Sequence, residues 1–285
     1  MGERLTFRQV DVFTGVPFKG NPVAVVHDAD RLTTEQMQEI ARWTNLSETT
    51  FVCAPSDERA DYRLRIFTPA SELPFAGHPT VGSAHAVLRA GLRPRTPGRL
   101  IQECGKGLIT LRVEGERIFF ELPRPSLRDP SVEEWAAAAG ALGISPEEVV
   151  AGAVIDVGPV WLTLQLKDAD LVRGLRPDQA RVAAATPPGG VGFTVFGLEG
   201  EGAESQFEVR SFAPTQGVSE DPVCGSGNGC VAALVRREGL LGQDSYVARQ
   251  GRCIGRDGRI EVKFEDGAIL VGGRAVTCVE GTLET

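Results

Sequence analysis

Residues 71–79 read Ser-Glu-Leu-Pro-Phe-Ala-Gly-His-Pro, and the pattern returns at residues 219–227 as Ser-Glu-Asp-Pro-Val-Cys-Gly-Ser-Gly. Aligned without gaps, residues 71–92 and 219–240 share nine identities in twenty-two positions, at an offset of 148 (219 minus 71). Chance would leave about one or two. Just upstream, residues 65–69 resemble residues 210–214. The sequence therefore predicts an internal duplication, with two halves of similar fold.

Each copy begins a helix that is apolar or small nearly all round, over residues 80–88 and 228–235. Such a helix is buried on every side, so strands must surround it. Small residues, among them Gly82 and Gly229, keep the helices thin enough to fit inside a strongly curved sheet. The turn at each helix start gathers unpaired N–H groups and the positive end of the helix dipole, which favours an anion. Two such sites, one in each half, could share one ligand.

The composition is that of a globular protein with little affinity for nucleic acid. Of the 285 residues, 24% are charged and 42% are hydrophobic, and the net charge is -8. The length suffices for two domains, each with its own core. An acidic chain with a pI of about 5.1 lacks the basic face that nucleic-acid binding needs. No signal peptide and no run of about 18 apolar residues is found, so we expect a cytoplasmic protein with no membrane partner.

The cysteines and histidines do not form a metal-binding pattern. Six cysteines, at positions 53, 104, 224, 230, 253 and 278, make no Cys-x-x-Cys pair and no zinc-ligand spacing with the three histidines. We expect reduced thiols that mostly pack as small hydrophobes, and no metal. Residues 225–229 lack the third glycine of a dinucleotide-binding loop and do not follow an apolar strand, so we expect no NAD.

Short strands dominate the first half. Strand-like composition or alternation occurs at residues 5–13, 22–26, 49–52, 60–67, 108–113 and 118–122. One helix begins after Thr33 or Thr34, and a second follows Pro79. The second half has the same style, with helices near 132–141 and 177–185 and strands near 161–166, 193–196, 207–212 and after Ser245.

Three prolines within residues 123–130 mark the expected linker, which we predict to continue neither a strand nor a helix. We therefore expect one domain over residues 1–124 and a second over residues 125–285. The last strand of the chain could cross back to the first half.

Residues that can do chemistry gather at the two repeated helix starts. Asp221, Cys224 and Ser226 lie at the second start, and His78 aligns with Ser226 (226 minus 78 is 148). If the halves face each other about a pseudo-twofold axis, both starts point into one crevice. That geometry suits a carboxylate or enolate oxygen held by backbone N–H groups between acid and base side chains.

Each of these residues also has a purely structural interpretation. His78 could satisfy a buried carbonyl, and Asp221 precedes a proline as in many turns. Cys224 could be a small buried side chain, although a helix start lowers a thiol pKa and favours the thiolate. Ser226 could be only an N-cap. The convergence of all four favours the functional interpretation.

At these residues the chain resembles the PhzF family, named for the phenazine biosynthesis isomerase and related to diaminopimelate epimerase and proline racemase. The resemblance covers essentially the whole length. It rests on four motifs in the right order, at residues 11–25 (Asp-Val-Phe-Thr through Gly-Asn-Pro-Val-Ala-Val), 45–49 (Asn-Leu-Ser-Glu-Thr), 72–80 and 220–226. It implies an α+β fold of two pseudo-symmetric domains, each a barrel-like sheet around a central α-helix. It also implies an active site between the halves and a homodimer.

The resemblance further implies roles for individual residues. Glu48 corresponds to the general acid/base of the family, and His78 and Asp221 correspond to its polar partners. A catalytic carboxylate at position 48 would need burial to raise its pKa toward neutrality. Substrate-binding positions are implied at Asn21, Ser47, Gly77, Cys224, Gly225 and Ser226.

One departure from the related racemases decides between mechanisms. Those enzymes place a cysteine at each helix start, whereas this chain has Cys224 in the second copy and Ala76 in the first. A two-thiol mechanism is therefore excluded. Our first hypothesis is a cofactor-independent isomerase, in which Glu48 moves a proton on a small carboxylate-bearing metabolite. The alternatives are an epimerase or racemase that uses Cys224, and a non-catalytic small-molecule binding protein of the same fold.

Overall fold

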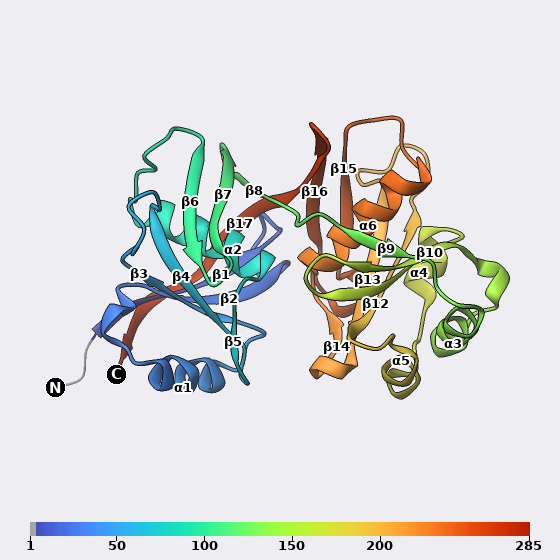
Figure 1. Ribbon diagram of the computed structural model, residues 1–285, viewed down its shortest axis with the longest axis horizontal. Coiled ribbons are helices and arrows are strands. Elements are labelled where there is room, and N and C mark those ends of the chain that lie inside the picture. Colours follow the sequence, from blue (N-terminus) through green and yellow to red (C-terminus); the bar gives the residue numbers. More distant parts are fainter. Residues whose placement is uncertain (1–3) are drawn as a thin grey trace. The chain divides into compact units, whose positions relative to one another are not determined.

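The computed structural model describes residues 4–285 as a mixed α and β protein (Figure 1). The chain divides into two compact units. Unit 1 comprises residues 4–121 and 272–285, and unit 2 comprises residues 122–271. No helix within residues 4–285 is long and apolar enough to cross a membrane.

Unit 1 is a closed barrel of eight strands. Each strand pairs with the next in the order β1, β2, β3, β4, β6, β7, β8, β17, and β17 pairs with β1. The β2–β3 and β4–β6 pairs are parallel. The strands are β1 (Arg4–Val12), β2 (Asn21–Val26), β3 (Thr49–Cys53), β4 (Tyr62–Phe67), β6 (Arg99–Cys104), β7 (Gly107–Glu114), β8 (Arg117–Glu121) and β17 (Ala268–Glu284), and β5 (Glu72–Leu73) forms a hairpin with β4.

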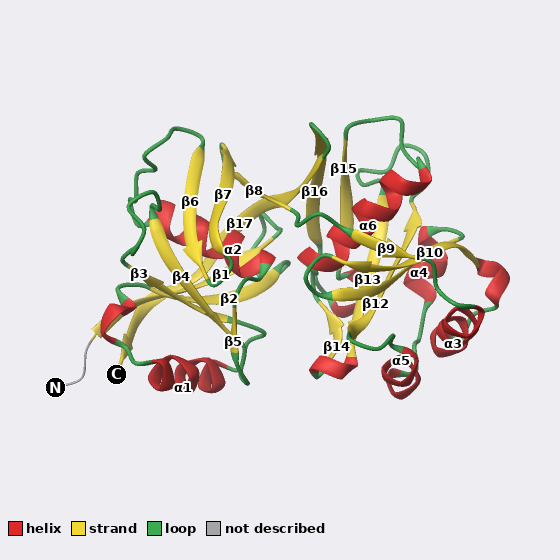
Figure 2. Cartoon of the chain, viewed as in Figure 1, coloured by secondary structure: helices red, strands yellow, loops and turns green. Residues whose placement is uncertain are grey.

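Helix α2 (Gly77–Arg89) fills this barrel, as Figure 2 shows in red among the yellow strands. Nine of its thirteen residues are buried, as expected for a helix that is apolar or small all round. A Cβ on Gly82 would lie 2.5 Å from Val23 Cγ1 and 2.8 Å from Val12 Cγ2. The helix therefore approaches β1 and β2 so closely that only glycine fits at this position.

Helix α1 (Thr34–Thr44) packs on the outside of the barrel. Thr33 caps it in a capping box with Gln36, as its position in the sequence predicts. Its buried residues Met37 and Ala41 join a core with Phe51 and Phe67.

Unit 2 repeats the strand order and strand directions of unit 1. Its strands pair in the order β9, β10, β11, β12, β13, β15, β16, and the β11–β12 and β13–β15 pairs are parallel, like β2–β3 and β4–β6. They are β9 (Ser126–Arg128), β10 (Val149–Asp156), β11 (Val160–Leu166), β12 (Gly190–Leu198), β13 (Phe207–Ala213), β15 (Ser245–Gln250) and β16 (Gly258–Glu265), and β14 (Val218–Asp221) forms a hairpin with β13.

Helix α6 (Gly225–Glu238) is the counterpart of α2 and is buried over most of its length. Helices α3 (Val132–Leu142), α4 (Ala169–Gly174) and α5 (Gln179–Ala185) complete the unit. The repeated strand order and the two buried helices confirm the predicted duplication.

Four details of the sequence prediction were wrong or incomplete. Residues 123–130 are not free of regular structure, because Ser126–Arg128 retain their N–H groups between the prolines and form β9, which pairs with β10. Helix α2 begins at Gly77 rather than after Pro79, since a proline fits the first turn of a helix. Ser226 is not the N-cap of α6, which is Cys224. Strands β5, β6, β10 and β14 and helix α4 were not expected.

Candidate active site

Glu48 and His78 lie next to each other in unit 1. Glu48 is the residue before β3, and His78 is the second residue of α2. Glu48 Oε2 lies 3.2 Å from His78 Nε2, and the two side chains are 16% and 9% exposed. The main chain at Glu48 is tied to the barrel, because its carbonyl accepts from the Ala24 amide at 3.4 Å.

Burial keeps the His78 ring neutral at pH 7. Desolvation lowers the pKa of His78 to about 3, although a hydrogen bond to the Pro22 carbonyl acts in the opposite direction. His78 Nε2 is buried and makes no hydrogen bond, so we assign the ring N–H that binds the Pro22 carbonyl to Nδ1. The lone pair of Nε2 then faces Glu48. His78 Nε2 can therefore accept a hydrogen bond from Glu48 when that carboxyl group is protonated.

This buried histidine predicts a loss of stability in acid. The folded protein binds a proton at His78 only near pH 3, whereas the unfolded chain does so near pH 6.5. Stability from His78 is thus full above pH 6.5 and falls with pH down to about 3, by roughly 1.4 kcal/mol per pH unit. Urea unfolding of wild type and His78→Gln between pH 7 and 5 should show a smaller pH slope in the variant. Equal slopes would contradict a neutral buried His78.

Unit 1 contains three further residues that were expected at the site, namely Asn21, Ser47 and Gly77. Asn21 is buried at the start of β2, directly before Pro22, whose carbonyl binds His78. Ser47 is exposed in the turn before Glu48. Gly77 begins α2, and a Cβ there would lie 2.7 Å from Phe120 Cζ, so the close approach of this helix start requires glycine.

Asp221, Cys224 and Ser226 come together in unit 2. Asp221 ends β14, and its Oδ1 accepts from the Val223 amide at 3.0 Å in the turn toward α6. Desolvation raises the pKa of Asp221 to about 6, against hydrogen bonds from Val223 and the Cys224 thiol. Ser226 Oγ lies 3.6 Å from Cys224 Sγ and accepts from Trp161 Nε1 at 3.0 Å.

Of the two interpretations of Cys224, the structure favours the small buried side chain over the thiolate. Desolvation and the neighbouring Asp221 carboxylate raise the thiol pKa of Cys224 well above its ordinary value, and the helix start does not offset them. The sulfur instead caps the helix by accepting from the Gly227 amide at 3.3 Å. All six cysteines are free.

The two helix starts offer the same pair of backbone donors. The N-cap is Ala76 in α2 and Cys224 in α6, which are the residues that the offset of 148 aligns. At the third helical position α2 has a proline, which carries no N–H group, and the Gly227 amide of α6 is occupied by Cys224. The first two amides of each helix have no intrahelical acceptor. These are Gly77 and His78 in α2, and Gly225 and Ser226 in α6.

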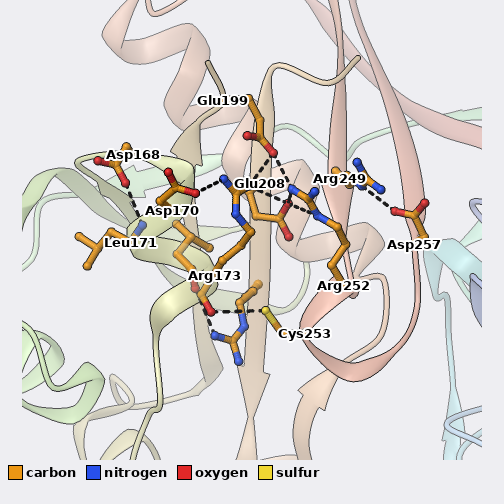
Figure 3. Close-up of polar contacts among 12 residues, drawn as sticks. Asp168, Asp170, Leu171, Arg173, Glu199, Glu208, Arg249, Arg252, Cys253 and Asp257 are labelled. Carbon is orange, nitrogen blue, oxygen red and sulfur yellow. Dashed lines mark hydrogen bonds and ion pairs between the residues drawn. The ribbon is translucent and has the colours of Figure 1, made fainter. Parts of the chain in front are cut away.

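Gln250 holds the start of α6 in place. Its Oε1 accepts from the Cys224 amide at 3.1 Å and from Asn228 Nδ2 at 2.7 Å, and its Nε2 donates to the Asp221 carbonyl at 3.0 Å. Two residues further on, Arg252 binds the carboxylate of Glu208, which is fully buried, and that of Glu199 (Figure 3). This network fixes the segment that carries Gln250.

Sequence reasoning missed Trp161 and Gln250. For Gln250 the signal was available, because Gln102 lies 148 residues earlier (250 minus 102) and donates to Thr80, the residue aligned with Asn228. Trp161 has no repeated counterpart, so its role depends on the folded strand. Within residues 4–285 no group of three His, Cys, Asp or Glu side chains could hold a metal ion.

Comparison with known proteins identifies relatives that align with nearly the whole chain. Residues 10–281 match the PhzC-PhzF family model, described as phenazine biosynthesis-like protein. A Schizosaccharomyces pombe protein named Antisense-enhancing sequence 1 is 42% identical over 291 residues, 97% of each chain. The trans-2,3-dihydro-3-hydroxyanthranilate isomerase of Pseudomonas fluorescens is 36% identical over 285 residues, 96% of this chain and 97% of that protein.

Solved structures of the same family have the same fold. The crystal structure of a PhzF-family phenazine biosynthesis protein from Bacillus anthracis has a TM-score of 0.87 with this protein at 26% identity, and the match covers 99% of each chain. The chain therefore belongs to the PhzF family of phenazine biosynthesis-like proteins, whose relatives include named isomerases.

Proposed function

We propose that the protein is a cofactor-independent isomerase that moves a proton on a small carboxylate-bearing metabolite, with Glu48 as the proton carrier. The observation that carries this proposal is the distance of 3.2 Å between Glu48 Oε2 and His78 Nε2, both largely buried. When Glu48 is protonated, its O–H group can donate a hydrogen bond to the neutral imidazole of His78. When Glu48 is deprotonated, its carboxylate oxygen can accept a proton from the substrate. A proton carrier needs this property.

The proposed reaction runs in two proton transfers. The Glu48 carboxylate takes a proton from a carbon beside a carboxylate or a conjugated acid, and the electron pair of the broken C–H bond spreads over the conjugated system. Glu48 then returns the proton to another carbon, so atoms and charge balance without an oxidant. The open amides at a helix start stabilise the negative charge that develops on oxygen. Asp221, with a pKa of about 6, can hydrogen-bond a polar group of the substrate in either protonation state.

The relatives support this class of reaction. The Pseudomonas fluorescens protein is named an isomerase of a dihydro-hydroxyanthranilate, which is a conjugated cyclic carboxylate. We propose a substrate of the same chemical class, a carboxylate in conjugation with or next to an acidic C–H bond. The burial of His78 suits the exclusion of water from such a site.

Solvent deuterium provides the test. The wild-type protein is incubated in D₂O with a panel of unsaturated cyclic and linear carboxylates that it binds in thermal-shift assays, and incorporation is followed by mass spectrometry. Catalytic gain of one deuterium with a shifted double bond supports the isomerase. A ligand that binds tightly but never exchanges would contradict it and favour the non-catalytic binding protein.

The Cys224→Ser variant separates the isomerase from a thiol-dependent racemase. Because the Cys224 thiol has a raised pKa and caps a helix, we expect kcat to fall by less than about threefold, within the effect of a weakened helix cap. Steady-state kinetics with a substrate found by deuterium exchange provide the measurement. A loss of about 10³-fold would favour an epimerase or racemase that uses this thiol.

A further inference from the structure

We infer that Trp161 is a positioning residue: its indole N–H group orients the Ser226 hydroxyl so that the hydroxyl proton is donated to a carboxylate of the ligand. This inference rests on the proposed function, because it assigns the binding of the substrate carboxylate to the start of α6.

The hydrogen bond between the two side chains fixes its own direction. Trp161 lies on β11, is only 3% exposed, and places Nε1 3.0 Å from Ser226 Oγ. An indole nitrogen can donate but not accept, so the serine oxygen must be the acceptor. The serine proton is therefore directed away from Trp161.

The neighbouring groups leave this proton for a ligand. Ser226 Oγ also lies 3.6 Å from Cys224 Sγ, but sulfur is a weak hydrogen-bond acceptor and this sulfur already receives the Gly227 amide. Beside the hydroxyl, the amides of Gly225 and Ser226 have no intrahelical acceptor. The start of α6 thus carries three donors, and Ser226 is only half-buried there. A carboxylate oxygen accepts from such a set.

The equivalent place in unit 1 has the opposite polarity. There the second residue of the helix is His78, and strand β2, the counterpart of β11, offers the carbonyl of Pro22 in place of an N–H group. The Pro22 carbonyl accepts a hydrogen bond from the His78 ring and leaves Nε2 as an acceptor. Trp161 instead donates a hydrogen bond to Ser226 and leaves the serine hydroxyl as a donor. One strand position in each unit thus sets whether the helix start accepts or donates.

Binding of anthranilate and its neutral amide tests the inference. Titration calorimetry is carried out with wild type, Trp161→Phe, Ser226→Ala and the double variant, with anthranilate and with anthranilamide as probes. We expect each single variant to bind anthranilate about tenfold more weakly, the double variant to bind no more weakly than Ser226→Ala, and anthranilamide to be affected by less than about twofold. With a turned-over substrate, KM should rise while kcat changes little.

Several outcomes would overturn it. Trp161→Phe could bind anthranilate as tightly as wild type, the two single losses could add in the double variant, or both probes could lose affinity equally, as expected of a merely structural residue. Ser226→Thr, which keeps the hydroxyl, should retain affinity within about threefold.

A second measurement tests the hydrogen bond in a variant that retains Trp161. In the ¹⁵N-tryptophan spectrum, one of the three indole N–H signals should move upfield in Ser226→Ala; no movement would contradict the bond. The same calorimetry in the Glu48→Gln background needs no turnover. It therefore distinguishes failure of the carboxylate site from failure of the proposed proton transfer.

Discussion

The Glu48→Gln variant is expected to lose at least about 10³-fold in kcat, because glutamine keeps the size and polarity of the side chain but cannot take up the substrate proton. His78, the titratable group beside Glu48, is a poor replacement base because burial lowers its pKa to about 3. His78 Nε2 faces Glu48, and the other ring nitrogen is occupied by Pro22. Steady-state kinetics of purified wild type and variant, with circular dichroism to confirm the fold, give the comparison.

Glu39→Gln provides the matched control. Glu39 is an exposed carboxylate on α1, in the same unit, and the same change there should leave kcat within about twofold of wild type. If Glu48→Gln kept more than a tenth of the wild-type kcat, Glu48 would be excluded as the proton carrier.

The Gly82→Ala variant is expected to be less stable by about 2 kcal/mol, since the added methyl group would lie 2.5 Å from Val23 Cγ1 and 2.8 Å from Val12 Cγ2. Both valines are fully buried in the barrel wall, so neither can move without displacing its strand. The greater helix propensity of alanine offsets only about 1 kcal/mol of this strain. Urea unfolding measures the difference.

Gly140→Ala is the matched comparison for this prediction. Gly140 lies in α3, is exposed, and would place a Cβ with no atom within 4 Å. Because the added methyl group meets no neighbour, only the higher helix propensity of alanine changes the free energy of unfolding. The variant should be more stable by about 0.5–1 kcal/mol. Opposite signs for the two substitutions support a helix enclosed by the barrel, and a stabilised Gly82→Ala would contradict that packing.

The duplication was the part of the fold that the sequence could predict best. A gapless repeat placed the two N-caps, Ala76 and Cys224, at equivalent positions, and the lack of a polar face on both helices required strands around them. The order of the strands could not be derived in this way. The parallel β4–β6 pair, for example, joins segments separated by α2, and no local pattern specifies such a contact.

The candidate site was only partly predictable, for physical reasons that differ between residues. Glu48 lies in a polar turn, and its selection depended on the family resemblance; its proximity to His78 comes from the way β3 and α2 meet. The sequence left the state of Cys224 open, because a helix start favours a thiolate whereas burial favours the thiol; in the structure desolvation and Asp221 raise the thiol pKa. Trp161 could not be found, since its contact with Ser226 joins residues 65 positions apart.

The most direct test of the central claim, that one carboxylate carries the proton, is the rate of deuterium incorporation from D₂O into a bound carboxylate substrate, measured by proton NMR in parallel for wild type, Glu48→Gln and Cys224→Ser. We predict exchange at similar rates in wild type and Cys224→Ser, and none above the uncatalysed rate in Glu48→Gln. Exchange that persists in Glu48→Gln, or that disappears in Cys224→Ser, would contradict the account.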